Sequence, residues 1–166
     1  NQVPKTKNGL GERMVEIQVN PSVEYIPSHD EIEALARVAF QRLLLHTSHD
    51  SFGIHFTNDE EIQTLNAQYR GFDKPTDVLS FEADVFDPDE EVTYLGDIVI
   101  SVETMQKQAE VAKHPLATEM LLLITHGLLH LVGFDHATQE EKDEMWALQT
   151  EILTMAGITP NKLPED

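Results

Sequence analysis

Three histidines in the C-terminal part of the chain have the spacing of a metal site. They are His126, His130 and His136, within the segment THGLLHLVGFDH. Residues four apart on an α-helix project from nearly the same face, so the first two imidazoles can share one ion. Gly133 follows one turn later, where a glycine can adopt a left-handed conformation, end the helix and let the chain return with the third histidine. A single histidine on an apolar helix is more often a core residue, but the third histidine argues for coordination.

The chemistry that fits this spacing is that of a catalytic zinc site. Three neutral imidazoles with an open fourth position are typical of catalytic rather than structural zinc. The chain has no cysteine, so we expect one Zn²⁺ per chain on imidazole ligands, although nickel or copper would also bind them. The spacing also matches the metzincin peptidases, HExxHxxGxxH, except that Gly127 replaces their glutamate base. The pattern therefore predicts a metal site but argues against a peptidase.

Two cations bracket a turn earlier in the chain, in the segment YRGFDKPTDVLSF. Arg70 and Lys74 stand out because the chain has 11 basic residues against 30 acidic ones. A guanidinium can bind a phosphate through two parallel hydrogen bonds and stabilise charge that develops in phosphoryl transfer. A single arginine or lysine is more often an ordinary surface residue. Two cations at one turn of so acidic a chain are nevertheless candidates for phosphate binding.

The composition limits the partners and the location. The 166 residues carry a net charge of −19, which repels polyanions at long range, although one positive cleft could still form locally. The same charge would attract basic proteins. We find no apolar run that could span a membrane and no signal-peptide pattern, so no membrane partner and a cytoplasmic location are the default expectations.

The pattern of strands and helices that must position these residues predicts an α+β domain. We expect a flexible tail over residues 1–13 and a single domain over 14–166, with a small mixed four-stranded sheet and about five helices. The helix that carries the first two histidines is apolar nearly all round, so it must be the central buried helix of the core. The segment 84–91 is expected to be an acidic loop. The expected strands are 14–20, 51–57, 77–82 and 94–101, and the expected helices are 28–46, 57–69, 101–113, 116–132 and 138–156.

Three motifs together resemble the YbeY family of bacterial and organellar endoribonucleases. They are HGLLHLVGFDH at 126–136, YRGFDKPTDVLSF at 69–81 and LGDIVIS at 95–101, in the family's order and spacing. The resemblance covers about residues 51–157. It implies a metal-dependent, single-strand-specific endoribonuclease that matures the 3′ end of 16S rRNA and acts in ribosome quality control. It also implies small-subunit ribosomal proteins and an assembly GTPase as partners.

The resemblance implies roles for particular residues. The three histidines match the family's zinc ligands, and Arg70 matches its functional arginine, which makes Arg70 a catalytic candidate and Arg70 and Lys74 candidates for binding RNA. Asp135 either orients one of the metal ligands without binding the metal itself or is a simple turn residue.

The sequence leaves two questions open. No general base is identified, so the nucleophile is either a metal-activated water or the RNA's own 2′-hydroxyl. The alternatives to a nuclease are a ribosome-assembly factor with a structural metal and little nuclease activity, and a metzincin-like zinc hydrolase.

Overall fold

The computed structural model describes residues 14–27 and 29–161, so the tail predicted for 1–13 and the first residue of the helix predicted for 28–46 lie outside the described residues. The predicted order of strands and helices and the α+β class are confirmed. The elements are β1 (Val15–Val19), α1 (His29–Arg42), β2 (Asp50–Thr57), α2 (Asp59–Arg70), β3 (Val78–Asp87), β4 (Val92–Ser101), α3 (Val102–Ala112), α4 (Leu116–Leu131) and α5 (Gln139–Met155).

The sheet is mixed and has β3 at one edge. Its order is β1-β2-β4-β3, with β1 and β4 both parallel to β2 and with β3 antiparallel to β4. Strand β4 is paired on both sides and covered on both faces, which is why Ile98, Val99 and Ile100 are consecutive apolar residues and are all buried.

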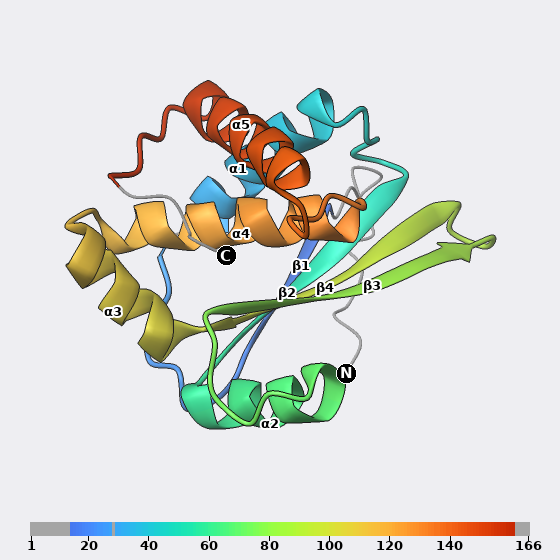
Figure 1. Cartoon of the computed structure of the whole chain (residues 1–166). Helices are drawn as coiled ribbons and strands as arrows, with labels where there is room; N and C mark the ends of the chain where they lie inside the picture. Colours follow the sequence, from blue (N-terminus) through green and yellow to red (C-terminus); the bar gives the residue numbers. More distant parts are fainter. Residues whose placement is uncertain (1–13, 28, 162–166) are drawn as a thin grey trace.

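Helices cover both faces of the sheet (Figure 1). Helix α4 crosses one face, with α1 and α5 packed beyond it, and α2 covers the other face, where Ile62 packs against Leu79 and Val99. Every residue of α4 from Glu119 to Leu129 is buried, so the predicted central helix is indeed enclosed on all sides. In the part of the chain that the structure describes, no helix combines the length and the apolarity needed to cross a bilayer.

Only residues 88–91 of the acidic segment 84–91 form a loop, whereas residues 84–87 belong to a strand, which corrects the prediction. Strand β3 continues to Asp87 and β4 begins at Val92, so the two strands form one long hairpin (Figure 1). A bulge between Glu82 and Val85 shifts the register, after which Val85 pairs with Tyr94. Acidic residues have low strand propensity, and the bulge interrupts the alternation, so the pattern of the sequence conceals this part of the strand.

Two helix ends also differ from the prediction. Helix α1 ends at Arg42 rather than near His46, because Leu44 adopts a positive φ of 60° and is 86% exposed instead of joining the apolar face. Helix α2 is capped by Asn58, whose side chain accepts a hydrogen bond from the backbone N–H of Glu61 at 2.8 Å. Thr57, where the helix was predicted to begin, is buried, and its hydroxyl donates to the Glu61 carboxylate instead.

Candidate metal centre

The structure brings the three predicted histidines to one point. His126 and His130 lie on α4, and their Nε2 atoms are 3.2 Å apart. His136 comes from the segment after the helix, and one ring nitrogen from each residue lies within 4.8 Å of the other two. Such a cluster of imidazole nitrogens can hold a metal ion on three protein ligands.

The turn after α4 delivers the third histidine in the way the sequence suggests. The backbone N–H of Phe134 donates to the carbonyl of Leu129 at 3.0 Å, and that of Gly133 donates to His130 at 3.1 Å. Gly133 has a φ of 102°, and a Cβ at this position would meet no atom within 4 Å. The glycine is therefore required by the backbone conformation rather than by crowding.

The protonation states of His126 and His130 suit the binding of a cation. Burial, followed by the charges of neighbouring imidazoles, lowers the pKa of His126 to about 4. Burial and the proximity of His136 also lower the pKa of His130. Both rings are therefore neutral near pH 7, and a neutral imidazole is the form that can donate a lone pair to a metal.

Helix α5 forms the back wall of this centre and contributes two residues that the sequence analysis missed. The Nδ1 atom of His126 lies 3.0 Å from the Oε1 atom of Gln149, which is fully buried. The ring of Trp146 lies edge-on at 5.4 Å between centroids from both His126 and His136. The available signal was a glutamine at a position of α5 where the helical periodicity calls for an apolar residue.

Arg70 and the three histidines line one hollow of about 450 Å³. Its Nη2 atom donates to the backbone carbonyl of Ser80 at 2.6 Å, and its Cζ atom lies 5.3 Å from the centroid of the Phe81 ring. A guanidinium has five N–H donors, and this contact with Ser80 involves one terminal nitrogen. The hollow is also lined by the acidic residues Asp77, Glu82 and Asp135.

The other two candidate residues lie in different places. Lys74 is exposed on the loop beyond Arg70, with its Nζ atom 5.7 Å from the centroid of the Phe72 ring, and it is not among the residues that line the hollow. Asp135 does line the hollow, and its Oδ1 atom accepts a hydrogen bond from the backbone N–H of His136 at 2.8 Å. This contact holds the backbone of the third histidine rather than an imidazole ring.

Gly127 faces the sheet, where there is no room for a side chain. A Cβ atom here would lie 2.8 Å from Cγ2 of Ile98. The carbonyl of Gly127 accepts a hydrogen bond from the Ser80 hydroxyl at 3.0 Å. The packing therefore excludes the glutamate base that a metzincin carries at this position.

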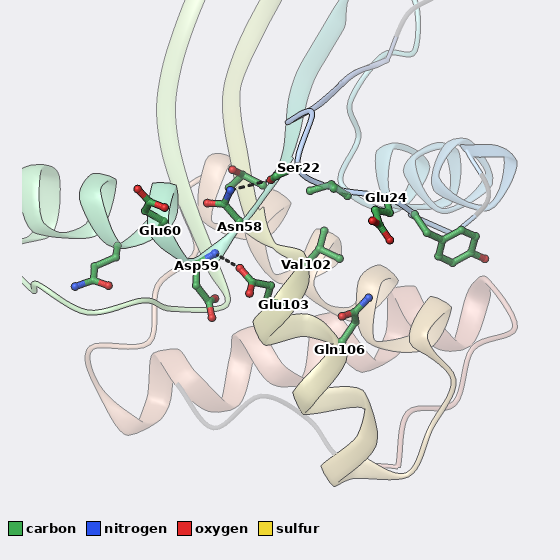
Figure 2. Close-up of a pocket in the computed structure, with 12 residues that line it drawn as sticks. Ser22, Glu24, Asn58, Asp59, Glu60, Val102, Glu103 and Gln106 are labelled. Carbon is green, nitrogen blue, oxygen red and sulfur yellow. Dashed lines mark hydrogen bonds between the residues drawn. The ribbon is translucent and has the colours of Figure 1, made fainter.

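A second hollow lies between the N-terminal ends of α2 and α3 and has a polar lining (Figure 2). The backbone N–H of Asp59 donates to the Glu103 carboxylate at 2.8 Å, and the Asp59 carboxylate accepts from the Ser101 hydroxyl at 2.5 Å. Asn58 donates to the Ser22 hydroxyl at 2.8 Å. These groups cap the two helices and join the elements around this hollow, which is a structural role.

The hollow of this α+β fold is lined by three imidazoles and an arginine. This arrangement is expected of a metal-dependent enzyme that acts on phosphate esters. A family model described as endoribonuclease YbeY matches residues 17–157. The chain belongs to this family of endoribonucleases, which confirms the resemblance of the three motifs.

Individual relatives agree with this membership. The chain is 42% identical to the endoribonuclease YbeY of Heliobacterium modesticaldum over 76% of its length and 82% of the relative. It is 37% identical to that of Shouchella clausii, over 87% of this chain and 97% of the relative. A solution structure of a Thermotoga maritima protein has a TM-score of 0.53 and 22% identity, covers 90% of this chain and 97% of the other, and supports the fold.

Proposed function

We propose that residues 14–166 act as one zinc-dependent domain that cleaves single-stranded RNA internally. His126, His130 and His136 would hold one Zn²⁺, and Arg70 would bind the phosphate next to the bond that is cut. The observation that carries this proposal is the convergence of three imidazole nitrogens within 4.8 Å of one another in the hollow that Arg70 also lines.

The donor set fits zinc. The three donors are nitrogen atoms, two of them on rings whose pKa values are lowered. Imidazole nitrogens are ligands that Zn²⁺ prefers, and three of them leave a position open for a water or a substrate. Bound zinc supplies Lewis-acid chemistry, either by lowering the pKa of a bound water or by polarising a phosphoryl oxygen.

Arg70 would give the hollow its affinity for phosphate. Its side chain is exposed, and its guanidinium is held by the Ser80 carbonyl and lies near the Phe81 ring. A planar guanidinium held in this way is prepared for bidentate binding of a phosphate and for stabilising the charge that develops on it. Lys74, on the adjoining loop, would bind a phosphate further along the strand.

The substrate we propose is precursor rRNA of the small ribosomal subunit, cut near its 3′ end, with a role in ribosome quality control. A cytoplasmic location accompanies this substrate. Small-subunit ribosomal proteins, which are mostly basic, would be attracted by the net charge of −19. An assembly GTPase is the second protein partner that the family resemblance implies.

The test combines metal analysis with RNA cleavage. The purified protein is analysed for metal and incubated with a single-stranded RNA that carries the small-subunit 3′ precursor, beside a DNA oligonucleotide of the same sequence. We expect about one zinc per chain, as an open catalytic site requires, and cleavage that is strongly reduced in Arg70→Ala. Zinc without cleavage, or cleavage that does not depend on Arg70, would favour an assembly factor with a structural metal.

The products distinguish the two possible nucleophiles. Attack by the RNA's own 2′-hydroxyl leaves a 2′,3′-cyclic phosphate and cannot occur on DNA. Attack by water leaves a linear phosphate and is compatible with some cleavage of DNA.

A further inference from the structure

Helix α5 carries none of the proposed metal ligands, yet one of its faces closes the metal centre from behind. Trp146 and Gln149 are three residues apart, so they lie on the same side of the helix. Trp146 contacts the rings of His126 and His136, and Gln149 contacts His126 alone. Each of these contacts joins residues that are separated by at least ten positions in the sequence.

The amide of Gln149 determines which nitrogen of His126 carries the proton. A neutral imidazole has one N–H and one nitrogen with a free lone pair. With Oε1 of Gln149 at 3.0 Å from Nδ1, the N–H must be at Nδ1 if a hydrogen bond is to form. The lone pair is then at Nε2, which lies 3.2 Å from Nε2 of His130, on the side where the ligand nitrogens gather.

Gln149 is not explained by packing. The residue has 0% exposure, and its Nε2 atom has no hydrogen-bond partner among the described residues. A buried donor without a partner lowers the stability of the fold. A leucine or methionine of similar volume would fill this space without that loss, so the amide must contribute through its oxygen.

We propose that Gln149 is a positioning residue of the metal centre, which holds His126 in the tautomer that binds metal through Nε2. The inference rests on the proposed function, because it assumes that the three histidines hold zinc. An amide performs this role without adding a negative charge, whereas a carboxylate would reduce the positive charge of the loaded site. In a protein with a net charge of −19, a neutral partner preserves the local attraction for a phosphate.

The experiment uses the full chain and two substitutions, Gln149→Leu and Gln149→Glu. Zinc affinity is measured by competition with a chromophoric chelator, and the thermal midpoint is measured on metal-free protein. Loss of a hydrogen-bond partner behind a ligating histidine weakens metal binding by roughly 10- to 100-fold, and we expect this for Gln149→Leu. The metal-free midpoint of that variant should change little, because removal of the unpaired amide N–H offsets the loss of the acceptor for the His126 Nδ1–H. Gln149→Glu keeps an accepting oxygen and should restore the affinity to at least the wild-type value.

Nitrogen-15 chemical shifts of His126 in the metal-free protein provide a second readout. We expect the Nδ1–H tautomer in wild type and a mixture of tautomers in Gln149→Leu. Thr150→Val, at the adjacent exposed position, is the matched control and should change neither property.

Two outcomes would overturn the inference. One is wild-type zinc affinity in Gln149→Leu, and the other is a parallel loss of affinity and of metal-free stability, which would identify Gln149 as a structural residue. A wild-type protein that binds no zinc would instead refute the proposed function itself, and the inference with it.

Discussion

The hydroxyl of Ser80 donates a hydrogen bond to the backbone carbonyl of Gly127 at 3.0 Å, and this bond joins β3 to the helix that carries the histidines. The backbone carbonyl of the same serine accepts the hydrogen bond from Arg70 at 2.6 Å. Ser80 thus connects the arginine to the histidine helix, although Arg70 and His126 come from distant parts of the chain. The distance between Arg70 and the histidines therefore depends on the position of β3.

Ser80→Ala should weaken the attachment of β3 to α4 while the backbone contact with Arg70 remains. A half-buried hydrogen bond contributes about 1 kcal/mol, so we expect the free energy of unfolding to fall by about that amount. Urea denaturation of the metal-free protein measures it, and zinc content should not change. A variant as stable as wild type would show that the bond adds nothing to stability.

Arg70→Lys tests whether the site needs only the positive charge of Arg70 or also the planar shape of its guanidinium. A lysine keeps the positive charge but lacks the planar fork, so we expect single-turnover RNA cleavage to slow by about 100-fold. Zinc content and the thermal midpoint should equal those of wild type. Wild-type cleavage by Arg70→Lys would mean that the site uses only the charge.

In Lys74→Ala, which removes a cation from the adjoining loop, we expect weaker RNA binding but an unchanged rate of cleavage at saturating enzyme.

Gly127→Ala should destabilise the protein, because the new methyl group would lie 2.8 Å from Cγ2 of Ile98. Overpacking of this kind costs about 1–3 kcal/mol. The cost should be smaller in an Ile98→Ala background, where the clashing side chain is absent, and a double-mutant cycle measures the difference. Equal costs in both backgrounds would mean that the loss of stability does not come from the contact with Ile98.

The stability of the metal-free protein should fall as the pH decreases from about 6.5 to about 4. The pKa of His126 is lowered from 6.5 to about 4 in the fold, so in this range the unfolded chain binds a proton that the folded chain does not. The difference corresponds to about 3 kcal/mol, which is present above pH 6.5 and lost on acidification. Denaturation of the metal-free protein at several pH values tests this, and His126→Leu should flatten the dependence.

The parts of the site that depend on local geometry could be predicted from the sequence. The convergence of His126 and His130 follows from helical spacing, and the return of His136 follows from a glycine after the helix end. The capping box of α5, in which Thr138 and Glu141 each accept a hydrogen bond from the other's backbone N–H, was likewise readable from two residues three positions apart. Each of these features needs only a few neighbouring residues.

The features that depend on how distant elements cross could not be predicted. The contact between His126 and Gln149 spans 23 residues and requires the packing of α5 on α4. The hydrogen bond between Arg70 and Ser80 requires the loop between α2 and β3 to fold back. A sequence indicates that a buried glutamine or a turn arginine is present, but not which partner it meets.

The position of β3 at the edge of the sheet has a consequence for the proposed cleavage of RNA in the histidine hollow. Arg70, Glu82 and Asp135 are all exposed, and the hollow they line lies where this outermost strand meets the end of α4. A long chain can lie across such a site from the side, with both of its ends far away. No end of the RNA has to pass through the hollow, so a bond in the middle of the RNA is as accessible as one near a terminus.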